Sequence, residues 1–123
     1  MRITDLDHIV LVSPDPLELL AWYVDHLGLA PERVEEYRAG EVLFPSGRVS
    51  AGTLVDFLAG ERTGENMNHV CFAAENVDFE ALAADPGIEV LGEPTSLWGA
   101  RGQAMSMYLR DPVGNVVEIR TYD

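Results

Sequence analysis

The stretch Asp7-His8-Ile9-Val10-Leu11-Val12 decides the fold, because it recurs later in the chain as Asn68-His69-Val70-Cys71-Phe72-Ala73. In both copies a histidine is the second residue of an apolar run that is typical of a buried strand. A short polar break and an amphipathic stretch follow each copy. The two histidines are 61 residues apart in a chain of 123. The repeat therefore predicts two half-size modules with equivalent histidines, and a fold that joins the modules can bring both histidines to one point.

The length and composition favour one soluble domain. The chain has 47% apolar and 24% charged residues, which is too apolar for a disordered chain. No apolar run approaches the ~20 residues of a membrane span, and the N-terminus lacks the basic and apolar regions of a signal peptide. We therefore expect a cytoplasmic protein with no membrane partner, folded as one domain over residues 1–123 from modules 1–60 and 66–123.

The charge and the cysteine content exclude other classes. A net charge of −13 argues against a nucleic-acid partner, whose phosphates need Lys and Arg, whereas an acidic surface accumulates cations. Cys71 is the one cysteine, so an intramolecular disulfide and a cysteine-rich zinc site are both excluded. Its apolar neighbours predict a buried, inert thiol.

The first module has one well-marked helix and several weaker strands. Leu6–Val12 is expected to be a buried strand. Asp15 as an acidic N-cap, Pro16 at the first helical position and Glu18 at the capping-box position predict the start of a helix. Apolar residues then recur at spacings of three and four, and Gly28 is the expected stop. Weaker strands are predicted around residues 33–37, 41–44 and 52–58, with turn signals at 39–40 and 45–47.

The second module repeats this order. A strand over residues 68–73 is expected to lead into a helix capped by Asn76 that runs through Ala84. Strands follow around residues 89–91, 105–109 and 116–122. The last two are joined by Asp111-Pro112-Val113-Gly114, with Asp, Pro and Gly where a type I turn favours them. Each module is thus predicted to be βαβββ, within an α+β fold, with a polar linker at residues 60–66.

The repeat also nominates two carboxylates. Glu118 lies in the apolar run Val116-Val117-Glu118-Ile119, and the offset between the histidines places its counterpart at residue 57, one residue from Asp56. A carboxylate inside an apolar strand is costly unless it is paired or binds a metal. Two imidazoles and one or two carboxylates suit Fe(II), Mn(II), Ni(II), Co(II) or Zn(II). Two histidines with one carboxylate would leave coordination positions open for substrate oxygens.

Each of these residues also has a structural explanation. A single histidine in a strand is more often a hydrogen-bonded core or surface residue than a metal ligand. Glu118 could be the outward residue of an edge strand, and Asp56 still more easily so. It is the joint placement of His8, His69, Glu118 and Asp56 at symmetric positions that favours one shared site.

These residues resemble the vicinal oxygen chelate superfamily, which includes glyoxalase I, extradiol dioxygenases, and fosfomycin- and bleomycin-resistance proteins. The most specific matches are Leu6–Leu11, Trp22–Leu29 and Tyr108–Glu118, and the resemblance covers nearly the whole chain. It implies paired βαβββ modules that form a curved mixed sheet around a metal-binding cleft. By position, it implies His8, His69 and Glu118 as ligands of one divalent metal ion, with Asp56 where glyoxalase I has a fourth, glutamate ligand.

Three differences from known members of the superfamily narrow the choice among its subfamilies. Bacterial glutathione-dependent glyoxalases have an arginine at the position of Val12, and glutathione-type fosfomycin transferases have a threonine at that of Val10. Bleomycin-binding members lack the metal ligands that are present here. The superfamily's shared chemistry is the binding of two adjacent substrate oxygens by the metal, which acts as a Lewis acid.

Two further residues are candidates for contacts with substrate. Tyr108 precedes Glu118 by ten residues, as the active-site tyrosine of extradiol dioxygenases does, and Ser106-Met107-Tyr108 also matches a Ser-x-Tyr of fosfomycin enzymes. Alternatively, Tyr108 is an ordinary aromatic residue of a strand. Arg101, in the glycine-containing segment 98–103, could clamp an anionic substrate from a mobile loop, or could be a solvated residue of a hairpin.

The sequence thus predicts a metal-dependent dioxygenase or glyoxalase-like lyase or isomerase that acts on a small molecule with vicinal oxygens. Tyr108 would orient the substrate, and Asp56 would be a fourth ligand or a base. The alternatives are a metal-free module that sequesters a drug or metabolite, and a scaffold that has kept its ligands without activity. The resemblance also implies a homodimer, in some members of which modules from two chains complete each site.

Overall fold

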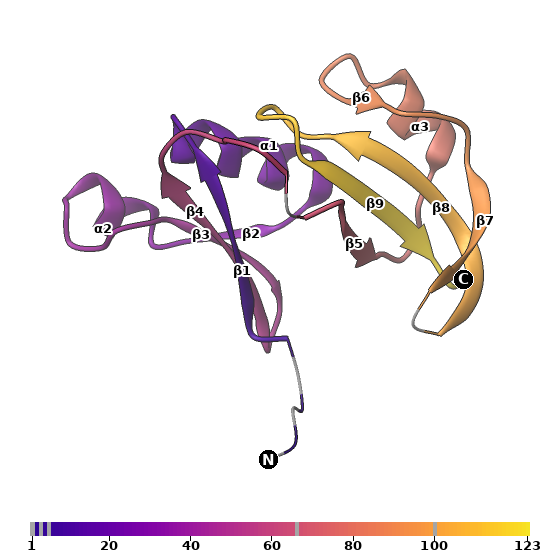
Figure 1. The fold of residues 1–123 in the computed structure, drawn as a ribbon, viewed down its shortest axis with the longest axis horizontal. Coiled ribbons are helices and arrows are strands. Elements are labelled where there is room, and N and C mark those ends of the chain that lie inside the picture. Colours follow the sequence, from indigo (N-terminus) through magenta and orange to yellow (C-terminus); the bar gives the residue numbers. More distant parts are fainter. Residues whose placement is uncertain (1, 3, 5, 66, 100) are drawn as a thin grey trace. The chain divides into compact units, whose positions relative to one another are not determined.

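The computed structural model describes residues 2, 4, 6–65, 67–99 and 101–123 (Figure 1). The chain divides into two compact units, Met1–Thr63 and Gly64–Asp123. Each unit has its own mixed sheet and at least one helix. The predicted α+β class is therefore confirmed, with two separate sheets.

The first unit is a four-stranded sheet with two helices. Its elements are β1 (His8–Ser13), α1 (Pro16–Leu27), β2 (Ala30–Glu32), α2 (Val34–Arg38), β3 (Ser46–Ser50) and β4 (Thr53–Ala59). The strand order is β1-β4-β3-β2. β1 is parallel to β4, and the other two pairs are antiparallel. The two strands that matter for function, β1 and β4, are thus direct neighbours.

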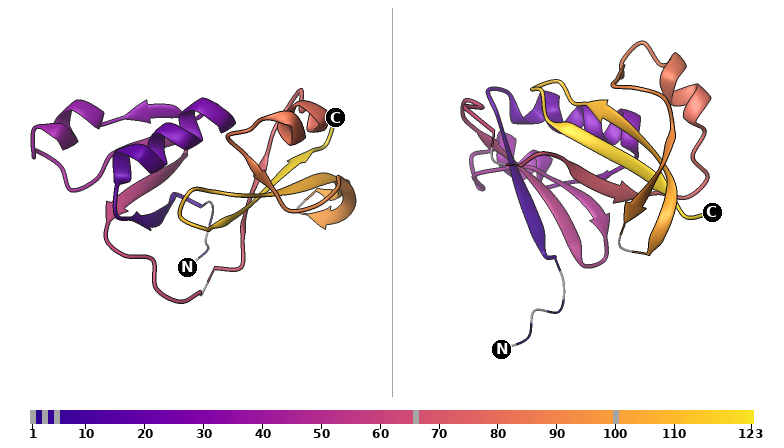
Figure 2. Two further views of the ribbon diagram at one scale, coloured as in Figure 1. Left: turned by 90° about the horizontal axis from the view of Figure 1, so that it is seen from above. Right: turned by 45° about the vertical axis from the view of Figure 1, so that its right-hand side comes forward.

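The ends of α1 follow the capping signals of the sequence. The Asp15 side chain accepts a hydrogen bond from the backbone N–H of Glu18 at 3.1 Å, and Gly28 ends the helix in the left-handed conformation. The helix lies along one face of the sheet (Figure 2). Tyr23 and Phe57 are fully buried between them, with ring centroids 5.3 Å apart. This packing assigns the α1 face of β4 to Val55 and Phe57 and leaves Asp56 on the opposite face.

The predicted structure between residues 33 and 47 is wrong in three places. Residues 33–37 were expected to form a strand, but the left-handed backbone of Arg33 ends β2 and Val34–Arg38 form α2. No strand forms at 41–44, and the turn expected at 45–47 is instead the start of β3. A Cβ atom at Gly47 would lie 2.8 Å from the Cδ2 atom of Leu29, so a larger residue there would force that side chain to shift.

The second unit has the same strand order with one strand added. Its elements are β5 (Val70–Ala73), α3 (Phe79–Ala84), β6 (Glu89–Val90), β7 (Thr95–Gly99), β8 (Gly102–Arg110) and β9 (Val116–Thr121). The order β5-β9-β8-β6 matches β1-β4-β3-β2, and β7 pairs separately with β8. β5 is parallel to β9, as β1 is to β4. The predicted βαβββ repeat is therefore present, with α2 added in one unit and β7 in the other.

The turn between β8 and β9 is organised by one carboxylate. Asp111 is 3% exposed, and its Oδ1 atom accepts hydrogen bonds from the backbone N–H groups of Val113 and Asn115. Its backbone carbonyl accepts from Gly114 at 3.0 Å, as the predicted turn requires. The turn establishes the pairing of Arg110 with Val116, which places Tyr108 opposite Glu118.

Two further predictions for the second unit need correction. The cap of α3 is Asp78, whose side chain accepts from the N–H of Ala81, whereas Asn76 has a left-handed backbone before the helix. β7 was not predicted, because Glu93-Pro94 precedes it and polar residues begin it. Within the described part of the chain, no helix has the length and hydropathy needed to cross a membrane.

Candidate functional site: two equivalent half-sites

The sheet registers give each unit an equivalent half-site. In the first unit Val10 of β1 pairs with Asp56 of β4, and in the second Cys71 of β5 pairs with Glu118 of β9. Each histidine, His8 or His69, lies two residues before the partner of the acid. Because side chains alternate along a strand, each histidine is on the same sheet face as its carboxylate. Asp56 and Glu118 are thus structural counterparts.

The two histidines are oriented by the residues that precede them. His8 Nδ1 lies 2.6 Å from Asp7 Oδ1, and His69 Nδ1 lies 2.8 Å from Asn68 Oδ1. A partner on Nδ1 fixes the ring and directs the lone pair of Nε2 outward, which is the usual arrangement of a metal-ligating histidine. Both half-sites therefore present the Nε2 atom, although one partner is a carboxylate and the other an amide.

The acidic partner of His8 has a measurable consequence. The hydrogen bond that His8 donates to Asp7 raises the pKa of His8 above its ordinary value, and the charge of Asp56 adds to this, while desolvation opposes it. The interaction therefore stabilises the fold at pH values below the ordinary pKa and is lost as the pH rises through the raised pKa.

Replacing Asp7 with Asn should lower the pKa of His8, because the amide keeps an acceptor for Nδ1–H but removes the negative charge. NMR titration of the His8 ring protons in the metal-free protein measures the shift. The control is Glu61→Gln, which removes a charge from an exposed residue of the linker and should leave the pKa of His8 unchanged. Equal values in the wild type and Asp7→Asn would show that Asp7 does not act on the ring.

In the second half-site the histidine and the carboxylate are in contact. His69 Nε2 lies 3.2 Å from Glu118 Oε2, and the Glu118 side chain is buried. The other oxygen, Oε1, lies 3.4 Å from a guanidinium nitrogen of Arg120, which is equally buried. The ring of Tyr108 packs edge-on against His69 at 5.4 Å between centroids. Strands β8 and β9 and the residue just before β5 thus contribute to one polar cluster.

Glu118 also acts on its two cross-strand neighbours. Desolvation and the negative charge of Glu118 raise the pKa of Tyr108, so the phenol stays protonated and can donate a hydrogen bond. The same causes raise the pKa of Cys71 to about 11. Cys71 is exposed, not buried as predicted, but its thiol is protonated at neutral pH and is a weak nucleophile.

The first half-site has a hydroxyl and an arginine in corresponding roles. Ser46 is fully buried and donates a hydrogen bond of 2.6 Å to Asp56 Oδ1. It pairs with Asp56 across β3 and β4, as Tyr108 pairs with Glu118 across β8 and β9. Arg33 lies 3.9 Å from the same Oδ1 atom. Each half-site therefore contains a histidine, a carboxylate, a hydroxyl and an arginine.

Arg101 reaches this cluster through Tyr122, whose ring also lies 5.0 Å from the guanidinium of Arg120. The predicted loop at 98–103 is the tip of the β7–β8 hairpin, and Ala100 lies outside the described residues. The backbone N–H of Arg101 donates to the hydroxyl of Tyr122 at 3.1 Å, and its guanidinium lies 4.2 Å from the centre of that ring. These contacts tie the hairpin tip to the end of the chain.

The sequence prediction missed several members of the half-sites. Asp7 and Asn68 belong to the repeat, so the acceptor side chain before each histidine could have been predicted from the sequence. Ser46 follows from applying the spacing of Asp56 and Glu118 to Tyr108. Arg120 carried no such signal, since its counterpart in the register of the first unit is Leu58.

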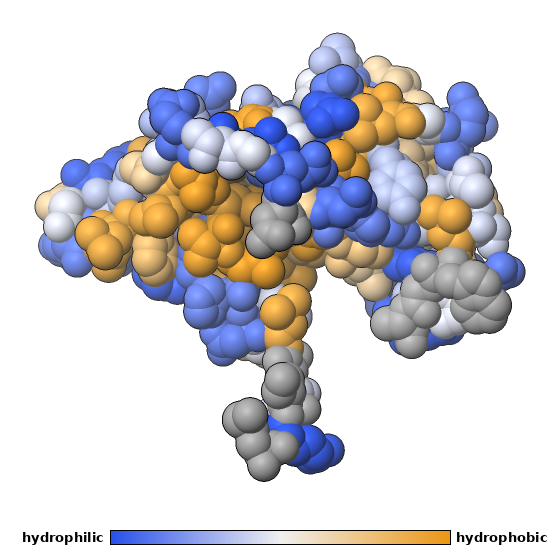
Figure 3. Space-filling model, in the orientation of Figure 1, coloured by the Kyte–Doolittle hydropathy of each residue, from blue (hydrophilic) through white to orange (hydrophobic). Residues whose placement is uncertain are grey.

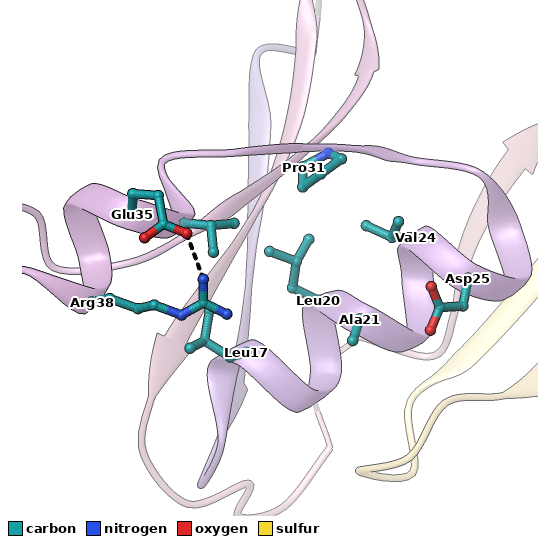
Figure 4. Close-up of a pocket in the computed structure, with 9 residues that line it drawn as sticks. Leu17, Leu20, Ala21, Val24, Asp25, Pro31, Glu35 and Arg38 are labelled. Atoms are coloured by element: carbon teal, nitrogen blue, oxygen red, sulfur yellow. Dashed lines mark hydrogen bonds and ion pairs between the residues drawn. The ribbon is translucent and has the colours of Figure 1, made fainter.

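No group of three or more His, Cys, Asp or Glu side chains that could hold a metal ion occurs in the described segments. Each unit instead contributes a histidine and one carboxylate. An apolar groove of about 390 Å³ lies between α1, β2 and α2 in the first unit (Figure 4). Its walls include Leu20, Val24 and Pro31, and it shares no lining residue with the half-site.

Comparison with known proteins gives the class. The sequence model of the Glyoxalase/Bleomycin resistance protein/Dioxygenase superfamily matches residues 5–119, and the chain belongs to this superfamily. The fold agrees with that assignment. The description covers both enzymes and drug-binding proteins, so membership alone leaves the activity open.

Individual relatives are more distant. The virulence protein STM3117 of Salmonella typhimurium is 29% identical over 128 residues, which cover 99% of this chain and 87% of that protein. The integron cassette protein VCH_CASS1 from the mobile metagenome of V. cholerae has a TM-score of 0.77 at 25% identity, over 100% of this chain and 98% of that one. Oxidase ChaP-H2 has a TM-score of 0.70 at 20% identity, over 99% and 96%.

Proposed function

We propose that this protein is a divalent-metal-dependent enzyme that acts on a small molecule with two adjacent oxygens, with His8, His69 and Glu118 as the metal ligands. The observation that carries the proposal is the matched orientation of the two histidines, whose Nδ1 atoms are both occupied by the preceding side chain. Such a partner is what a ligating histidine needs. The contact between His69 Nε2 and Glu118 Oε2 adds the carboxylate to the donor set.

The donor set suits the ions expected from the sequence. Imidazole nitrogen and carboxylate oxygen are ligands for Fe(II), Mn(II), Ni(II), Co(II) and Zn(II) alike. The buried Glu118 has an ion-pair partner, so its charge is tolerated in the fold without a metal. The bound ion would supply Lewis-acid polarisation of the substrate oxygens.

Tyr108 and Asp56 would act on the substrate. Tyr108 is protonated, pairs with Glu118 across the strands and packs on His69, so it would donate a hydrogen bond to a substrate oxygen and orient it. Asp56 has its Oδ1 atom held by Ser46 and Arg33, which leaves Oδ2 to accept a proton from the substrate or to serve as a fourth ligand. A dioxygenase or a glyoxalase-like lyase or isomerase reaction is compatible with these roles.

The proposal includes a cytoplasmic homodimer. Leu43 is 79% exposed and Val10 45% exposed, and hydrophobic side chains gather over the first unit (Figure 3). Contiguous apolar surface of this kind is typical of protein interfaces. Sedimentation of the purified protein measures the state of association. A dimer would allow each site to be completed by half-sites of one chain or of two.

The test is the metal content of protein purified without chelator. We expect close to one first-row ion per pair of half-sites by elemental analysis, and a lower melting temperature after chelation. Spectra with added catechols and with hemithioacetals then separate the two reactions, since ring cleavage produces colour. Protein without metal, whose stability is unaffected by chelator, would overturn the proposal in favour of a metal-free binding module.

A further inference from the structure

We infer that Arg120 is a positioning residue that holds one oxygen of Glu118 and so presents the other oxygen to the metal. The inference rests on the proposed function, in which Glu118 is a ligand. It adds a residue outside the predicted donor set and an asymmetry between the two half-sites.

The first support is the division of contacts between the two carboxylate oxygens. Arg120 Nη1 lies 3.4 Å from Glu118 Oε1, whereas His69 Nε2 lies 3.2 Å from Oε2. Glu118 and Arg120 are each 4% exposed, so little solvent competes for either oxygen. The carboxylate is therefore held with Oε2 on the side of the histidine and Oε1 turned away.

The second support is that Arg120 is itself held in place. Its Nη2 atom donates to the carbonyl oxygen of Leu97 at 2.7 Å, and its guanidinium lies 5.0 Å from the centre of the Tyr122 ring. A guanidinium fixed by a carbonyl and an aromatic ring can act as a rigid fork. Leu97 belongs to β7, so the added strand of the second unit provides an anchor for Arg120.

The third support is that the carboxylate of the first unit is held by residues from other positions. Leu58 occupies the register position of Arg120, and the first unit has no described counterpart of β7. Asp56 contacts Ser46 and, more distantly, Arg33, both through Oδ1. In the second unit the arginine thus lies two residues after the carboxylate on β9 and is anchored to β7, whereas in the first unit Ser46 and Arg33 hold one oxygen of Asp56.

Substitution of Arg120 tests the inference with Co²⁺ as the probe. In Arg120→Met we expect Co²⁺ to bind about 10- to 100-fold more weakly, the range seen when a partner of a metal ligand is removed. We also expect a changed visible spectrum, because the freed carboxylate can rotate. Arg120→Lys keeps the charge without the fork and should restore part of the affinity. The control, Arg38→Met, removes an exposed arginine that pairs with Glu35 in the first unit and should leave both readouts unchanged.

A second measurement needs no metal. Melting temperatures of metal-free wild type, Arg120→Met, Glu118→Gln and the double variant form a cycle, and we expect the double variant to lose less than the sum of the single losses. If the wild type binds Co²⁺ and both Arg120 variants match it in affinity and spectrum, the positioning role is overturned. If the wild type binds no Co²⁺, the proposed function fails and this role fails with it. If Arg120→Met does not fold, Arg120→Lys still decides between these outcomes.

Discussion

Replacing Glu118 with alanine should abolish tight metal retention and destabilise the metal-free protein by about 3–5 kcal/mol, the cost of leaving a buried charge without its partner. The uncompensated charge is that of Arg120, which is 4% exposed and contacts Glu118 directly. Domains of this size are typically stable by only 5–15 kcal/mol, so the loss is a large share of the total. Elemental analysis measures the first effect, and urea denaturation of the apoprotein measures the second.

Two further variants show how much of the loss of stability comes from the charge of Glu118 and how much from its burial. Glu118→Gln keeps the shape and one acceptor oxygen, so it should destabilise less than alanine while still weakening metal binding. Glu89→Ala removes the acid of the exposed pair with Arg110 and should cost no more than about 1 kcal/mol, as surface pairs do. Unchanged metal content in Glu118→Ala would exclude Glu118 as a ligand.

Replacing Phe57 with alanine should destabilise the protein by about 3–5 kcal/mol through the cavity that it leaves. Phe57 is fully buried and packs against the fully buried Tyr23 of α1, so few atoms can relax into the space. Because Phe57 follows Asp56 on β4, the loss would affect the strand that carries the first carboxylate. Urea or guanidinium unfolding gives the free energy directly.

The matched control is Leu91→Ala, which removes a large apolar side chain that is 38% exposed and lies outside the apolar surface of the first unit. We expect a change within about 0.5 kcal/mol, as for most surface positions. The loss of stability in Phe57→Leu should lie between that of Phe57→Ala and that of the control. A loss below about 1 kcal/mol for Phe57→Ala would mean that α1 does not depend on this contact with the sheet.

The parts of the fold that the sequence predicted well are those with local physical causes. Helix α1 was bounded correctly because Asp15 and Gly28 satisfy its terminal backbone groups. The turn at Asp111 was recognisable for the same reason. The region 33–47 was not predictable in this way, since the short β2 and β3 depend on pairing between distant residues and on the close approach of Gly47 to Leu29.

In the candidate site, too, some residues could be predicted from the sequence and others could not. The internal repeat nominated His8, His69, Asp56 and Glu118, and the registers place Asp56 and Glu118 in corresponding positions. The sequence did not predict a role for Arg120, because that role depends on a backbone carbonyl of β7. β7 itself was not predicted, since it begins with polar residues and follows a proline. Contacts that involve a backbone atom of a remote strand leave no pattern in a linear sequence.

The turn at residues 111–115 has a consequence for how members of this lineage can differ in length. Inserting or deleting a single residue there would shift β9 by one position against β8 and move every side chain of β9 to the opposite face of the sheet. Glu118 and Arg120 would then point away from His69. Natural variation in length should therefore be rare in this turn and concentrated in connections such as the described residues 61–65, which lie between strands of different sheets.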